Sequence, residues 1–219
     1  MHDKRREEPR MQTVMGARDL LLLLIGLDDS REGLGGITRI QKLLYLLESE
    51  ENIRPTGDGF KFEPYKAGPY SPRIYDDLEL LENLGFIRRS AVDNEAEGAV
   101  EASNEGVIEA SDPEKAEVDL TFDQLMGPED VLAARSDEIA PTADSYKESR
   151  FYLTELGKQR MERLLETADY KPFVAGIRKV KSRFSKYSLN DLLYYVYTRH
   201  PGMTTESEIK EKVLRRRPA

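Results

Sequence analysis

The residues that most often carry out chemistry in proteins are scarce in this sequence. It contains no cysteine and two histidines, so thiolate chemistry and disulfide bonds are excluded. His2 lies near the N-terminus, and His200 precedes a proline where a helix is expected to stop, a common place for a capping histidine. The carboxylates include no spacing that singles out an acid/base pair. The sequence therefore predicts a non-enzymatic protein with no cofactor and no metal site.

Glycines precede one expected helix, a setting in which backbone amides can bind phosphate. They are Gly33, Gly35 and Gly36. No strand pattern precedes them, and no Lys-Ser or Lys-Thr pair follows in the position that a P-loop requires. We therefore predict a turn here rather than a phosphate site.

Basic, aromatic and hydroxyl side chains gather in three places suited to binding nucleic acid. The first is the start of a helix expected from residue 71, the second is a pair of strands near residues 88 and 150, and the third is a basic helix over residues 171–186. Binding to DNA depends on Lys and Arg contacts to phosphates. The candidate nucleic-acid-binding residues are Lys66, Tyr70, Ser71, Arg73, Arg88, Arg89, Arg150, Arg178, Lys179 and Lys181.

Acidic side chains occupy the middle of the helix that starts near residue 71. They oppose phosphate contacts there and favour a basic protein partner instead, such as a toxin or a nuclease. The candidate partner-binding residues are Tyr65, Asp76, Asp77 and Glu79.

The formal net charge of −8 conceals an uneven distribution along the chain. Residues 90–149 carry 3 basic and 17 acidic side chains, whereas residues 150–219 carry 16 basic and 8 acidic ones. The acidic block is poor in aromatics and rich in Glu, Asp, Ala, Ser and Gly, a composition that rarely folds alone. We predict an acidic insertion joined to a basic C-terminal third.

Helical patterns with start and stop signals place these residues. A helix over residues 13–27 contains the apolar run 20–25, which predicts a central core helix. Residues 38–41 have the form of a capping box before a stripe that includes Leu43. Ser71 and Pro72 predict the start of the next helix, Leu78 faces inward, and Gly85 ends it.

Further along the chain, strand and helix signals continue. Residues 86–87 and 150–153 suit the two strands of a hairpin whose tip is the acidic insertion. Helices are then expected over residues 153–167 and 171–186, after a cap at Ser188, and after a second capping box at residues 205–208.

These elements predict a mostly α (α+β) protein. The expected fold is a winged-helix-like helical domain with a small β-hairpin wing and extra C-terminal helices. Its parts are a flexible N-terminal arm (1–12), a core (13–89 and 150–168), an acidic, largely irregular insertion in the wing (90–149) and a C-terminal helical extension (169–219).

Three segments are similar to a known prokaryotic family. They are residues 41–48, with Lys-Leu-Leu-Tyr-Leu, residues 62–71 and 75–78, with Gly-Pro-Tyr, and residues 152–157, Tyr-Leu-Thr-Glu-Leu-Gly. The chain resembles the SocA-like "Panacea" family of phage-associated antitoxins and neighbouring uncharacterised winged-helix-like proteins. The resemblance implies a mostly helical fold and a role as an antitoxin or regulator that binds a toxin, DNA or both. The acidic insertion departs from that pattern.

Two functions therefore remain open from the sequence. The first is a winged-helix regulator of transcription that binds DNA. The alternative is an antitoxin or antiviral-defence protein that binds and neutralises or regulates a basic protein partner. We expect a cytoplasmic protein without a membrane segment, because the longest apolar run, residues 20–25, is far shorter than a span of about 20 residues. A homodimer is compatible with either function.

Overall fold

A computed structural model describes residues 15–28, 33–91 and 149–215 of the chain. The described part is mostly helical and carries a small antiparallel sheet, which confirms the predicted α+β class. In chain order the helices are α1 (Ala17–Gly26), α2 (Ile37–Glu50), α3 (Arg73–Asn83), α6 (Glu155–Glu166), α7 (Lys171–Phe184), α8 (Leu189–Arg199) and α9 (Lys210–Arg215). Short 3-10 turns η2 (Ala168–Tyr170) and η3 (Pro201–Thr204) precede α7 and follow α8.

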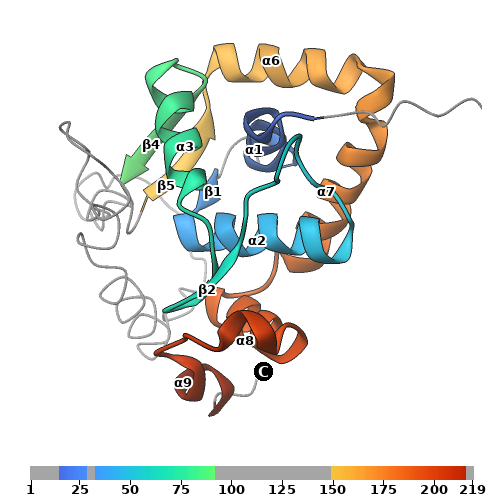
Figure 1. Cartoon of the computed structure of the whole chain (residues 1–219). Helices are drawn as coiled ribbons and strands as arrows, with labels where there is room; N and C mark the ends of the chain where they lie inside the picture. The colour runs from blue at the N-terminus through green and yellow to red at the C-terminus, as the bar shows by residue number, and fades with distance from the viewer. Residues whose placement is uncertain (1–14, 29–32, 92–148, 216–219) are drawn as a thin grey trace, which may run out of the picture.

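Helix α1 lies at the centre of the fold, as its apolar run predicts. Residues 20–25 are all buried, because the helix is surrounded by other elements on every side. Figure 1 shows α1 end-on, with α6, α7, α2 and α3 arranged around it. Deep burial of this apolar run gives α3, α6, α7 and β5 a common packing surface.

Three strands form the main sheet, in the spatial order β1-β5-β4. They are β1 (Leu34–Gly35), β4 (Ile87–Ala91) and β5 (Ser149–Leu153), and both pairings are antiparallel. Residues 92–148 connect β4 to β5, so the predicted acidic insertion joins the two strands of the expected hairpin, and nearly all of it lies outside the described residues. A separate hairpin, β2 (Glu63–Tyr65) with β3 (Gly68–Tyr70), stands between α2 and α3.

The expected capping box at residues 38–41 is wrong. Helix α2 begins at Ile37, after Gly36, and no side chain caps its first turn. The Gln41 side chain instead pairs with the backbone of Ser71: Oε1 accepts from the Ser71 N–H at 2.8 Å, and Nε2 donates to the Ser71 carbonyl at 3.0 Å. The Gln41 side chain, which the local pattern assigned to capping, therefore binds a residue 30 positions away in the chain.

Helix α3 begins close to its predicted start, but Ser71 does not cap it. The Ser71 hydroxyl donates to the Phe60 carbonyl, and the side chain is completely buried. The other end matches the prediction: Gly85 follows the helix with a φ of 73°, a left-handed conformation that glycine adopts without steric cost. Leu78 faces the core, as does Leu43 of α2.

Local signals predict the helices after the sheet well, with one exception. Thr154 caps α6 by accepting from the Gly157 N–H at 3.1 Å, and Ser188 forms a complete capping box with Asp191 at the start of α8. The exception is the last helix, because α9 begins at Lys210 and residues 205–208 form a turn rather than its capping box.

Candidate functional site

The turn before α3 brings together four of the predicted site residues. Tyr65 and Tyr70 stack with ring centroids 4.7 Å apart, and the Lys66 ammonium lies 6.0 Å from the Tyr65 ring centre. Arg73 donates to the Gly59 carbonyl at 2.8 Å. Ser71 does not join this surface, because its buried side chain fixes the loop from inside. We therefore correct Ser71 from a ligand contact to a structural residue.

A buried lysine that the sequence analysis did not select lies beneath this turn. Lys42 of α2 donates from Nζ to the Pro69 carbonyl at 2.9 Å. Burial lowers its pKa from 10.5 to about 7, because the charged amine has lost its water. The signal in the sequence was a lysine placed directly before the apolar Leu43–Leu44 pair. The neighbouring hollow, bordered by Tyr65, Tyr70 and Tyr75 among others, is only about 10 Å³, which leaves no room for an organic ligand.

The predicted wing cations are separated by their contacts. The Arg88 guanidinium lies 4.3 Å from the Tyr152 ring centre, and Arg89 pairs with Glu82 of α3 at 3.2 Å. Arg150 instead lines a hollow of about 230 Å³ near β1 and α7, together with Arg39 and Lys181. The strand register also places Arg89 on the opposite face of the sheet from Arg88 and Arg150, so the three arginines do not form one surface.

The basic face of α7 is directed largely at the chain itself. Lys179 pairs with Glu51 at 2.7 Å, and Arg178 lies 3.8 Å from Asp28. The buried Lys181 donates from Nζ to the Leu24 and Leu27 carbonyls, which stabilises the C-terminal end of α1. We correct Lys181 from a nucleic-acid contact to a helix-capping residue.

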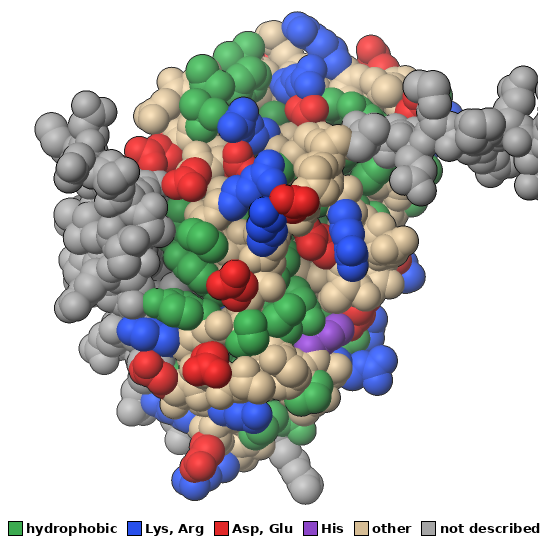
Figure 2. Space-filling view, in the orientation of Figure 1, with side chains coloured by type: hydrophobic (Ala, Val, Ile, Leu, Met, Phe, Trp, Pro, Cys, Tyr) green, Lys and Arg blue, Asp and Glu red, His purple; other side chains and the backbone are tan. Residues whose placement is uncertain are grey.

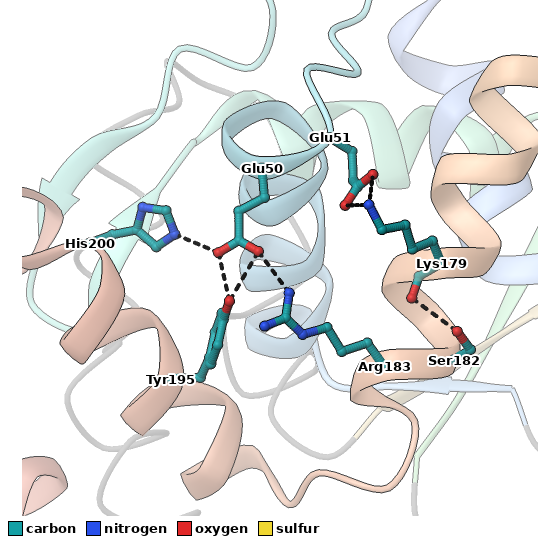
Figure 3. A network of polar contacts seen from close by, with 7 residues as sticks. All are labelled: Glu50, Glu51, Lys179, Ser182, Arg183, Tyr195 and His200. Carbon is teal, nitrogen blue, oxygen red and sulfur yellow. Dashed lines mark hydrogen bonds and ion pairs between the residues drawn. The ribbon is translucent and has the colours of Figure 1, made fainter.

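Polar side chains converge on Glu50 at the last turn of α2 (Figure 3). Its carboxylate accepts from the Tyr195 hydroxyl at 2.9 Å, lies 3.0 Å from His200 Nε2 and pairs with Arg183 Nη1 at 3.2 Å. Burial, followed by the Glu50 carboxylate, raises the pKa of Tyr195. His, Glu and Tyr also occur together in active sites, but each of these groups is used here to join α2 to α7 and α8.

The two neighbouring aspartates of α3 have different environments. Asp76 is exposed, whereas Asp77 is buried. The Asp77 carboxylate accepts from Arg18 Nε at 2.8 Å, and its Oδ2 lies 3.4 Å from Arg73 Nε without accepting a hydrogen bond in the described structure. Asp77 therefore joins α1 to α3, and we correct its assignment as a partner contact. Asp76 and the partly exposed Glu79 remain on the outer face.

An apolar groove that the sequence analysis missed lies where α3 ends and α6 begins. Its volume is about 370 Å³, and it is lined mainly by apolar side chains, with arginines at its edge. Leu84 is 53% exposed and Leu156 is 46% exposed, and both line the groove. Figure 2 shows hydrophobic side chains gathered at the upper end of this face, beside Lys and Arg side chains. A shared apolar hollow of this kind is typical of an interaction site.

The described residues show neither a metal site nor a membrane span. No group of three His, Asp or Glu side chains among them is placed to hold a metal ion, and no described helix is both long and apolar enough to cross a bilayer. Comparisons of the chain with protein-family models, curated proteins and solved structures found no match. The resemblance to the Panacea family therefore stays a prediction.

Proposed function

We propose that this chain is a non-enzymatic protein-binding module of the antitoxin or adaptor type, with a winged-helix-like core. The order α1-β1-α2-α3-β4-β5, with the β2–β3 hairpin between α2 and α3 and with β1 beside β5, supports the winged-helix interpretation. In that interpretation α3 is the helix that a DNA-binding relative would place in the major groove. The fold alone does not distinguish DNA from a protein as the ligand. The charge of α3 is therefore the feature that we use to choose between them.

The observation that carries the proposal is the charge arrangement around α3. Its outer face carries Asp76 and Glu79, and the nearby Arg89 is paired with Glu82. On α7, the exposed Arg178 and Lys179 face Asp28 and Glu51. DNA binding requires cations that can exchange small counterions for phosphates, and ion pairs within the chain compete with that exchange. An acidic α3 instead suits a basic surface on another protein.

The test is capture of a partner from a nuclease-treated lysate of the organism that encodes the chain. We expect one protein retained in stoichiometric amount by the full chain and absent from the eluate of Asp76→Lys/Glu79→Lys. The matched control reverses two exposed acids, Glu166 at the end of α6 and Asp169 in η2, as Glu166→Lys/Asp169→Lys, and should retain the partner. DNA in the untreated eluate, with no protein after nuclease treatment, would contradict the proposal.

DNA-binding regulation is the second candidate, because the winged-helix-like order of elements favours it. In that case Lys66, Arg73 and the Arg178–Lys179 pair would bind the phosphates. Arg178→Ala/Lys179→Ala should then weaken binding and flatten the log–log salt slope by about one unit for each phosphate that the variant no longer neutralises. Fluorescence anisotropy with duplex DNA at low salt measures both quantities, and absence of binding there rejects this candidate.

A further inference from the structure

The groove between α1, α3 and α6 is held in shape by hydrogen bonds beneath its rim. The Thr154 hydroxyl donates to the Gly85 carbonyl at 2.6 Å, and the Thr154 N–H donates to the Phe86 carbonyl at 3.0 Å. These bonds fix the end of α3 against the start of α6. Since the backbone on both sides is fixed, the groove is preformed and a ligand does not have to order it on binding.

The groove lining is apolar, and its most accessible members are leucines. Leu22, Leu81 and Phe86 form the inner part, while Leu84 and Leu156 stand at the opening. The remaining exposed large hydrophobic side chain in the described part of the chain is Leu214, on α9 and outside this groove. Two of the three exposed leucines therefore lie at one groove. Single exposed leucines scattered over a surface are ordinary, but two that share a hollow indicate an interaction site.

The charged rim of the groove is predominantly basic. Arg18, Arg160 and Arg163 line it together with one acid, Asp19. Arg160 binds Asp19 through two hydrogen bonds, at 3.0 and 2.8 Å, and Arg18 binds the buried Asp77. Arg163 is exposed, and no acidic side chain within the described residues forms an ion pair with it. Two of the three arginines are therefore compensated within the chain, and Arg163 is the rim cation available to meet a carboxylate on an incoming chain.

We infer that this groove is the docking site for an amphipathic helix of a partner protein, with a leucine-type stripe and acidic residues on its flanks. An apolar groove that accepts such a stripe at spacings of three and four residues is a recurrent mode of helix recognition. Arg163 selects an acidic residue on a flank of that helix, and Leu84 and Leu156 contact the stripe. This inference deepens the proposed function, because it requires that the ligand is a protein.

Asp76 near the start of α3 and Arg163 of α6 at the groove define how such a partner is oriented. Asp76 lies in the first turns of α3 and attracts a basic surface, whereas the groove lies beyond the last turn and attracts an acidic helix. A partner with both features docks in one direction, since reversing it places like charges together.

The experiment uses the full chain and a fluorescein-labelled, alanine-based helical peptide with a leucine stripe and flanking glutamates. We expect saturable binding by anisotropy and chemical-shift changes at the methyl groups of Leu84 and Leu156 in leucine-labelled protein. Leu84→Ser/Leu156→Ser should weaken binding by about tenfold or more, as truncation of central apolar side chains does. Leu214→Ser is the matched control and should bind as the wild type does.

The preference for acidic flanks is tested separately, with a second peptide and a charge-reversed variant. A peptide with lysines in place of the glutamates should bind more weakly than the glutamate peptide, and Arg163→Glu should reverse that preference. Arg215→Glu, on α9, is the control and should not. Equal binding of both peptides, or equal binding by wild type and Leu84→Ser/Leu156→Ser, overturns the inference.

Two further results separate this inference from the proposed function. If a captured partner binds Leu84→Ser/Leu156→Ser as tightly as the wild type, the groove assignment fails while the protein-binding function stands. If sedimentation shows a dimer of the wild type that the same variant abolishes, the occupant is a second copy and the inference is overturned.

Discussion

The C-terminal end of α2 and the C-terminal end of α3 present opposite kinds of surface. Around Glu50, polar side chains from α7 and α8 satisfy one another at distances of 2.9–3.2 Å. Around Leu84 and Leu156, apolar side chains stand exposed in a preformed groove. The first arrangement has its interactions completed within the chain, and the second has an apolar surface still to be covered.

This difference separates the residues that stabilise the fold from the residues that are available to bind a partner. Helix α2 uses Gln41, Lys42 and Glu50 to hold the β2–β3 hairpin and the C-terminal helices in place. The leucines at the groove opening bury little surface within the chain. Substitutions on α2 should therefore alter unfolding, whereas substitutions of the two leucines at the groove opening, Leu84 and Leu156, should alter binding alone.

The largest effect of a polar side chain is expected at Lys42, and it depends on pH. Its pKa is about 7 in the folded chain and 10.5 as the ordinary value, so between these values the unfolded chain binds a proton that the folded chain does not. Stability should therefore rise with pH, by about 3 kcal/mol from pH 7 to about pH 9.5. Lys42→Met should remove this rise.

Urea unfolding of wild type and Lys42→Met at a series of pH values measures the effect as a difference. The range ends below pH 10 because buried tyrosines titrate above it, among them Tyr197, whose pKa is raised to about 12. Parallel pH profiles of the two proteins would show that the Lys42 amine keeps its ordinary pKa in the folded state.

Glu50→Ala should have the next largest effect. It removes the acceptor of Tyr195, the partner of Arg183 and the neighbour of His200 in one change. Hydrogen bonds to charged groups contribute about 1.5–3 kcal/mol, so we expect a decrease of about 2–3 kcal/mol in the free energy of unfolding. Glu51→Ala, which removes the neighbouring exposed pair with Lys179, should cost less than about 1 kcal/mol. Equal decreases for the two variants would show that the Glu50 contacts stabilise the fold no more than the Glu51–Lys179 pair does.

The elements that depend on local signals were predictable from the sequence. The apolar run 20–25 and the cap at Ser188 act within one or two turns of the chain, and both are confirmed. The capping box at residues 38–41 failed for the opposite reason. Gln41 finds a better partner in the backbone of Ser71, and no pattern within α2 contains that information.

The candidate site was less predictable, because its properties are set by contacts between distant parts of the chain. The charge of α7 is offset by Glu50 and Glu51, which precede Arg183 and Lys179 by 133 and 128 residues. Leu84 and Leu156 form one groove only because Thr154 joins the start of α6 to the end of α3. The spacing of residues in the sequence shows neither that the charges of α7 are paired within the chain nor that Leu84 and Leu156 are exposed.

Gly157→Ala tests the close approach of α6 to the chain after α3 and should have an intermediate effect. A Cβ at Gly157 would overlap the Phe86 carbonyl oxygen, so α6 must shift away from the end of α3. Overpacking of this kind costs about 1–3 kcal/mol. Thermal unfolding measures the decrease, and Gly202→Ala is the control, because a Cβ there meets nothing within 4 Å. An unchanged melting temperature for Gly157→Ala would mean that the two helices are not held together as tightly as described.

The smallest stability effect is expected from the two groove leucines themselves. Leu84 and Leu156 are about half exposed, and surface substitutions usually change stability by no more than about 0.5 kcal/mol. Leu84→Ser/Leu156→Ser should therefore unfold like the wild type, whereas Leu81→Ala, only a few residues away but buried, should be destabilised by about 2–5 kcal/mol. Chemical denaturation of the three proteins makes the comparison. If the double variant is destabilised as much as Leu81→Ala, the exposed leucines belong to the core, and the contrast between the completed α2 surface and the open groove disappears. If the double variant is as stable as the wild type but no longer binds the peptide, then Leu84 and Leu156 serve binding and not stability.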